Sequence, residues 1–203
     1  QGNNSYISTK EVSGTIISID NLSEDTTAPD QPSITTATTL TNDSTPTIEG
    51  TAEAGSFVTL FVDGATTGIT TTADETTGVY IIAPIVALSD GNHVLTVTAT
   101  DAAGNISPAS SALSITVDAT APAQPSITSS SLSNSSEPII NGTAEIGSSV
   151  ELFNGANSLG TDIVDEFGNF SITSSSLADN TYSLTVTATD EAGNTSSSSS
   201  VFN

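Results

Sequence analysis

Cysteine and arginine are absent from this chain of 203 residues, and its single lysine is Lys10. Without cysteine there are no disulfides and no thiolate metal ligands. Without clustered basic residues the chain lacks the charge pattern of nucleic-acid binding and of attachment to an anionic membrane surface. Tryptophan is also absent, which disfavours a sugar-binding surface built on aromatic side chains. No run of about 20 apolar residues, the length that spans a bilayer, is present, so no membrane insertion is expected.

Acidic residues, by contrast, number 23 and give a formal net charge of −22. Such a charge opposes compaction unless the acids are well spread or cations are bound. Several segments alternate apolar and polar residues, as in SFVTLFV at 56–62, HVLTVTA at 93–99 and ALSITVD at 112–118. This alternation is the mark of half-buried strands, and no segment has a convincing helical period. The sequence therefore predicts an all-β protein.

Three stretches of the chain occur twice. TAPDQPSIT at 27–35 is followed 93 residues later by TAPAQPSIT, GTAEAGS at 50–56 is followed 92 residues later by GTAEIGS, and LTVTATDAAGN at 95–105 is followed 89 residues later by LTVTATDEAGN. A repeat of about 90 residues indicates tandem whole domains and not a solenoid of short units. We therefore expect one domain at 27–119 and another at 120–203, preceded by an N-terminal strand and linker at 1–26.

Turn signals divide each unit into about seven short strands, which predicts an immunoglobulin-like sandwich. In the first unit these strands, A to G, lie near 31–35, 45–52, 56–63, 67–73, 79–84, 93–100 and 111–118. Tyr182, two residues before Leu184 of the sixth strand, resembles a tyrosine corner, in which the hydroxyl bonds back across the preceding turn. His93 occupies the same place in the first unit, which favours a structural role for the only histidine.

The two ends of the chain differ from the repeat. The second unit stops where its seventh strand should begin, whereas Ile17-Ser18-Ile19-Asp20 near the N-terminus resembles Ile115-Thr116-Val117-Asp118. The segment 1–26 is therefore expected to carry the seventh strand of a preceding or neighbouring domain. Two explanations stay open: a longer array is divided out of register, or the N-terminal strand of one molecule completes the last domain of another.

The motifs TAP.QPSIT, GTAE.GS, LSDG.H.LTVTATDAAGN and SALSITVDATAP occur in the same order as in a known family. Over residues 27–203 the chain resembles the bacterial Ig-like repeats of giant secreted adhesins, which include biofilm-associated proteins and calcium-dependent surface proteins exported by type I secretion. The resemblance implies an extracellular or cell-surface location, a spacer role, and calcium bound at the junctions between domains.

Acidic residues recur at the turns that an immunoglobulin-like topology places at the N-terminal end of each domain. Carboxylates that lie close together repel unless they share a cation, and calcium accepts six to eight oxygen ligands in flexible geometry. We therefore expect structural Ca²⁺ at two junctions. The alternative is that these acids are solvated turn residues, because Asp is a good turn former. The candidate ligands are Asp25, Glu53 and Asp101 at the first junction and Asp118, Glu145 and Asp190 at the second.

No nucleophile, base and orienting group come together in a pattern that would indicate an enzyme. The sequence therefore favours a non-catalytic spacer or stalk of an extracellular adhesin or surface filament, stiffened by calcium. The alternative is a fibre subunit that polymerises head to tail by donor-strand complementation. A calcium-dependent glycan-binding module is a third possibility. The expected partners are neighbouring repeats or other copies of the chain, and the sequence does not indicate a receptor.

Overall fold

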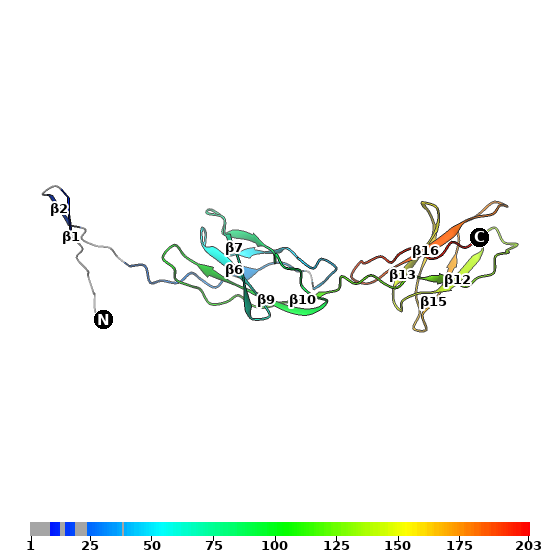
Figure 1. Cartoon of the computed structure of the whole chain (residues 1–203), viewed down its shortest axis with the longest axis horizontal. Helices are drawn as coiled ribbons and strands as arrows, with labels where there is room; N and C mark the ends of the chain where they lie inside the picture. Colours follow the sequence, from blue (N-terminus) through cyan, green and yellow to red (C-terminus); the bar gives the residue numbers. More distant parts are fainter. Residues whose placement is uncertain (1–8, 13–14, 19–23, 38) are drawn as a thin grey trace. The chain divides into compact units, whose positions relative to one another are not determined.

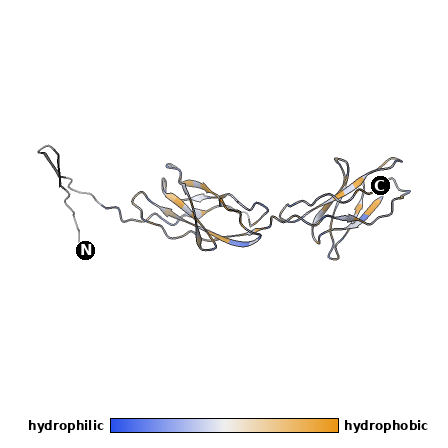
Figure 2. Cartoon of the chain, in the orientation of Figure 1, coloured by the Kyte–Doolittle hydropathy of each residue, from blue (hydrophilic) through white to orange (hydrophobic). Residues whose placement is uncertain are grey.

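The computed structural model describes residues 9–12, 15–18, 24–37 and 39–203, and these residues form strands and turns throughout (Figure 1). They contain no helix, and therefore none that could span a membrane. Figure 2 shows hydrophobic residues on the strands of both repeats, as the alternating sequence predicts. The all-β prediction is confirmed.

A short hairpin lies near the N-terminus. Strand β1 (Thr9–Val12) pairs antiparallel with β2 (Thr15–Ser18), with Lys10 opposite Ile17. The sequence predicted one extended strand in this region, and the structure divides it into two. The remainder of the predicted N-terminal segment, at 1–8, 13–14 and 19–23, lies outside the described residues.

The first sandwich has all seven predicted strands and one more. Its three-stranded sheet has the order β3-β5-β8, and its five-stranded sheet has the order β4-β10-β9-β6-β7. The additional strand, β4, has two residues and pairs parallel with β10. The bounds are β3 (Ser33–Ile34), β4 (Leu40–Thr41), β5 (Ile48–Thr51), β6 (Phe57–Val62), β7 (Ala65–Thr72), β8 (Val79–Ile82), β9 (Gly91–Thr100) and β10 (Leu113–Val117).

The second sandwich repeats this arrangement up to its sixth strand. One sheet has the order β11-β12-β15 and the other β14-β13-β16. No strand in the second sandwich takes the place that β10 has in the first. The bounds are β11 (Ser126–Ile127), β12 (Ile139–Thr143), β13 (Ser149–Asn154), β14 (Asn157–Ile163), β15 (Asn169–Thr173) and β16 (Leu184–Thr189).

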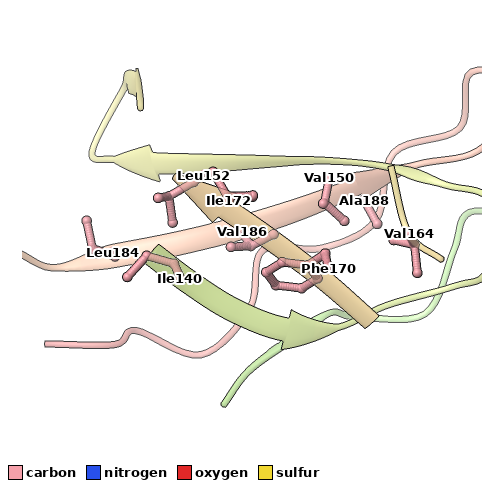
Figure 3. Packing of buried hydrophobic residues seen from close by; sticks show 9 residues of the cluster. All are labelled: Ile140, Val150, Leu152, Val164, Phe170, Ile172, Leu184, Val186 and Ala188. Atoms are coloured by element: carbon pink, nitrogen blue, oxygen red, sulfur yellow. The ribbon is translucent and has the colours of Figure 1, made fainter. Parts of the chain in front are cut away.

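Alternate residues along the strands form the core of each sandwich. In β16, every second residue from Leu184 to Ala188 is buried, and the residues between them are half-buried. Figure 3 shows these side chains with those of the facing strands, gathered in one apolar cluster between the two sheets. The cluster consists of Ile140, Val150, Leu152, Val164, Phe170, Ile172, Leu184, Val186 and Ala188.

A glycine at the same place in each unit allows an aromatic ring to lie against the backbone. A Cβ atom on Gly142 would lie 2.2 Å from both Phe170 Cζ and the Ser126 carbonyl oxygen. In the first unit a Cβ on Gly50 would meet the ring of Tyr80, whose hydroxyl donates a hydrogen bond of 2.7 Å to the Ser33 carbonyl. The repeated motif GTAE therefore begins with glycine because its strand passes beneath a buried ring.

Serines close the edge of each sixth strand. Ser107 and Ser110 are buried, and their hydroxyls accept the backbone N–H groups of Ala99 and Val97 at 2.9 and 3.1 Å. Each hydroxyl also donates to the carbonyl of the following residue. Ser196 and Ser199 make the same bonds in the second unit. These hydroxyls take the place of backbone carbonyls where the chain is not yet in a regular strand.

Candidate functional site

The turn after the sixth strand of the first unit is organised by one carboxylate. Asp101 accepts the backbone N–H groups of Ala103 and Asn105 at 2.9 and 2.8 Å through Oδ1. Its Oδ2 accepts the side-chain amide of Asn105 at 2.8 Å. That amide and the turn N–H groups hold the pKa of Asp101 below its ordinary value, against a smaller opposing effect of desolvation. The carboxylate therefore fixes both the turn and the orientation of Asn105.

The same Asn105 side chain also holds the segment that enters the first sandwich. Its amide donates a second hydrogen bond, of 3.0 Å, to the backbone carbonyl of Asp25. The side chain of Asp25 accepts the N–H of Thr27 at 3.0 Å, which makes a local turn in the same segment. We call this arrangement the linker clamp. In it, Asp101 fixes the turn, and the side-chain amide of Asn105 binds the backbone carbonyl of Asp25 in the segment that enters the sandwich.

The second unit has a linker clamp with the same geometry. Asp190 accepts the backbone N–H and the side-chain amide of Asn194, both at 2.8 Å. The Asn194 amide also donates to the backbone carbonyl of Asp118 at 2.7 Å. The Asp118 side chain accepts the N–H of Thr120 at 3.2 Å, matching the contact of Asp25 with Thr27. The repeated LTVTATD.AGN motif thus supplies the strand, the turn and the amide of each clamp.

A third D-x-x-G-N turn separates the role of the turn from the role of the clamp. Asp165 accepts the N–H groups of Phe167 and Asn169 at 2.9 and 2.8 Å, in the turn between β14 and β15. These backbone bonds, led by that of Asn169, hold the pKa of Asp165 below its ordinary value. The motif therefore specifies a turn by itself. What its asparagine amide reaches depends on where the fold places the turn.

A glutamine near the start of each unit makes a further long-range hydrogen bond, which the sequence did not predict. The side-chain amide of Gln31 donates to the carbonyl of Ala109, and that of Gln124 donates to the carbonyl of Ser198. Both glutamines belong to the repeated QPSIT motif, and both acceptors lie in the serine segment after the sixth strand. Repetition of the glutamine was the only sequence signal for this contact.

The two glutamates among the candidate calcium ligands form turns through their backbone. The Glu145 carbonyl accepts the N–H and the hydroxyl of Ser148 at 3.1 and 2.7 Å, and the Glu53 carbonyl accepts the N–H of Ser56 at 3.0 Å. Both glutamates are exposed. Across residues 24–37 and 39–203, and in the two N-terminal strands, no three His, Asp or Glu side chains group in a way that could hold a metal. Calcium at Asp25, Glu53 and Asp101, and at Asp118, Glu145 and Asp190, stays a prediction.

The tyrosine corner predicted in the second unit is confirmed. The Tyr182 hydroxyl donates a hydrogen bond of 3.0 Å to the carbonyl of Ala178, four residues upstream. His93 occupies the equivalent place, where its Nε2 lies 2.8 Å from the carbonyl oxygen of Ser89. The only histidine therefore has a structural partner at the corner.

Comparisons with known proteins agree with this fold. Residues 17–119 match the family described as a bacterial Ig-like domain, and residues 121–202 match the family described as a bacterial Ig domain. The search of curated proteins gave no match. The fibronectin(III)-like modules of CbhA from Clostridium thermocellum are similar in fold, with 14% identity, a TM-score of 0.52, and coverage of 83% of this chain and 90% of that one.

A second solved structure is titled as the BSP domain of a biofilm associated protein. It aligns with 20% identity over 85% of this chain, with a TM-score of 0.35. The chain spans 28% of that protein's length.

Proposed function

This chain belongs to the bacterial Ig-like domain family, and from that premise we propose that it is a non-catalytic spacer in an extracellular adhesin or surface stalk. The observation that carries the proposal is the linker clamp, which occurs in both units and ties the entering chain to the sandwich that follows it. A spacer transmits position and force along the chain, so the segments between its domains must resist free rotation. The clamp contributes to that resistance through the hydrogen bonds of Asn105 and Asn194.

The strength of the clamp is modest, as suits a repeated device. A neutral hydrogen bond contributes about 0.5–1.5 kcal/mol net. If one such hydrogen bond contributes 1 kcal/mol, its loss would change the ratio of bound to unbound conformations of the linker about fivefold. The composition also supports the proposal. A net charge of −22 favours a surface that repels neighbouring molecules. The matched bacterial Ig-like families are generally non-catalytic, which also supports a spacer.

The proposal is tested by removing one clamp. Asn194→Ala should free the linker carbonyl of Asp118 while the second sandwich stays folded. Nitrogen relaxation by NMR would then show the two sandwiches tumbling more independently than in the unchanged chain. Asn169→Ala is the matched control, because Asn169 ends the same D-x-x-G-N turn away from Asp118 and should leave tumbling unchanged. Equal effects of the two substitutions, or none from Asn194→Ala, would remove the clamp from the proposal.

Calcium at the junctions belongs to the same proposal as a separate part. An ion that binds only the folded state stabilises it by RT ln(1 + [Ca²⁺]/Kd). For a Kd of about 10⁻⁴–10⁻³ M, typical of extracellular modules, 10 mM calcium would contribute about 1.4–2.7 kcal/mol. Calorimetric unfolding in calcium and in EDTA measures this directly. Identical transitions would exclude structural calcium and leave the clamp-based spacer intact.

A further inference from the structure

The dipeptide Asn-Gly occurs twice in the chain, as Asn141-Gly142 and as Asn154-Gly155, and both lie in the second sandwich. Asparagine before glycine is chemically labile. The backbone nitrogen of the glycine can attack the asparagine side-chain carbonyl carbon, and glycine has no side chain to hinder that attack. The attack requires the backbone between the two residues to rotate, so the surroundings of each dipeptide decide whether it reacts.

The first dipeptide lies within a sheet. Strand β12 runs between β11 and β15, and Gly142 pairs with Ile127 on one side and with Phe170 on the other. The N–H of Asn141 donates to the hydroxyl of Ser129 at 2.6 Å, so its backbone is held as well. A Cβ atom on Gly142 would lie 2.2 Å from Phe170 Cζ, which leaves no space for rotation. Attack on the Asn141 side chain therefore requires the sandwich to open.

The second dipeptide lies at the tip of a hairpin. Asn154 ends β13 and pairs with Asn157, which begins β14, so Gly155 and Ala156 form a two-residue turn. Gly155 has a φ of +61° and occupies the first turn position, where a type II′ turn needs glycine. The hydrogen bonds of such a turn join its two flanking residues, so the N–H of Gly155 takes no part in the ladder.

The space around this turn is open. Gly155 is exposed, and a Cβ atom on it would meet no atom of the described residues within 4 Å, its chain neighbours aside. Hairpin tips open locally at a small cost in free energy, whereas a central strand opens with the whole domain. The backbone at Gly155 can therefore rotate while the sandwich stays folded.

We propose that Asn154 is a site of spontaneous deamidation, which the fold permits there and prevents at Asn141. The Gly155 nitrogen bonds to Cγ of Asn154 and closes a succinimide ring, while the bond from Cγ to Nδ2 breaks. The leaving amide takes up the proton of the Gly155 N–H and departs as ammonia. Water, the one co-reactant, then opens the ring at either carbonyl and gives aspartate or isoaspartate at position 154.

The first sandwich indicates which product the hairpin accepts. Its corresponding turn consists of Asp63 and Gly64, in the sequence LFVDGA where the second sandwich has LFNGA. An aspartate at the tip is therefore compatible with the hairpin. Isoaspartate adds one carbon to the backbone and so disturbs the pairing at the tip. Val150 and Leu152 of β13 are fully buried and lie away from the turn, so the core should persist.

Peptide mapping of the full chain tests the proposal. The protein is kept in warm, mildly alkaline buffer, folded or in urea, and digested after glutamate. The two dipeptides then lie in different peptides, because Glu145 and Glu151 stand between them. In the folded chain we expect conversion of Asn154 and at least about a thousandfold slower conversion of Asn141, since a small domain is folded at least about 10³ times more often than unfolded. In urea both should convert at similar rates.

Matched variants assign the modification by a second measurement. The new carboxylate should make aged protein elute later from an anion exchanger. Asn154→Gln should abolish this acidic species, because ring closure from the longer side chain is much slower, and Asn141→Gln should leave it unchanged. Equal rates at the two sites in the folded chain, or no conversion at Asn154, would overturn the proposal. So would slow conversion of Asn141 in urea, which would assign the difference to local sequence and not to the fold.

Discussion

The buried aromatic rings beside Gly50 and Gly142 allow the contribution of one hydrogen bond to be tested in both sandwiches. The ring in the first sandwich carries a hydroxyl, and the ring in the second does not. Tyr80 donates to the Ser33 carbonyl at 2.7 Å, whereas Phe170 has the same ring position without a donor. A Cβ on the glycine would lie 2.6 Å from Tyr80 Cζ in the first unit and 2.2 Å from Phe170 Cζ in the second.

Exchanging the two side chains should therefore move stability from one sandwich to the other. A net neutral hydrogen bond contributes about 0.5–1.5 kcal/mol, so Tyr80→Phe should cost about 1 kcal/mol in the first sandwich. Phe170→Tyr should stabilise the second by a similar amount, with its new hydroxyl donating to the Ser126 carbonyl. A change of 1 kcal/mol moves Tm by about 4–8 °C in a domain of this size.

Calorimetry of the single variants and of the double exchange measures both transitions. Leu60→Ala and Leu152→Ala assign them, since each truncates a side chain that is 0% exposed in one sandwich. Burial raises the pKa of Tyr80 to about 12. The phenol of Tyr80 is therefore neutral in the folded state. Its contribution to the free energy of unfolding is present below the ordinary tyrosine pKa of about 10 and is lost as pH rises toward 12. Tyr80→Phe should remove that alkaline loss. A lower Tm for Phe170→Tyr would refute the hydrogen-bond argument and indicate overpacking.

Three further outcomes are expected. Ser148→Ala should cost about 1 kcal/mol in thermal unfolding, because its hydroxyl donates to the Glu145 carbonyl. Ser56→Ala should be near neutral, because the buried Ser56 hydroxyl has no hydrogen-bond partner among the described residues. Because the pKa of Asp101 is lowered in the folded state, its carboxylate stabilises the first sandwich at pH values above the ordinary pKa of Asp, and this stabilisation is lost as pH falls through the folded pKa. Asp101→Asn should therefore weaken the decrease of Tm at acidic pH. Leu152→Ala should destabilise the second sandwich by about 2–5 kcal/mol in denaturant titration, since its side chain is fully buried.

The strands were predictable because a half-buried strand must alternate, and β6 and β9 show that alternation plainly. Strand β4 was not, because two residues carry no period and its pairing with β10 is a tertiary contact. The division of the N-terminal segment into β1 and β2 was missed for a related reason. Its alternation fits one long strand as well as two short ones.

The sequence was enough to identify acidic residues of the candidate site, but not to identify their hydrogen-bond partners. Repetition identified Asp101 and Asp190 and led to the prediction that they bind calcium, which stays a prediction. The sequence shows their charges and does not show the N–H donors around them. The structure supplies those donors from the turn itself and from Asn105 and Asn194. The contact from each asparagine to a carbonyl more than 70 residues earlier could only come from the folded chain.

The placement of both clamp residues inside the repeated motif has a consequence for how such genes change in length. The stretch LTVTATD occurs at 95–101 and at 184–190, so an unequal crossing-over within it would remove or add one unit of 89 residues. In the shortened product the turn of Asp190 and Asn194 would follow the first sandwich's sixth strand, and the amide would meet the Asp25 carbonyl that Asn105 holds now. The joint would be complete in the first generation, without compensating mutation. A change in the number of units by this route would thus keep the contacts of the clamp.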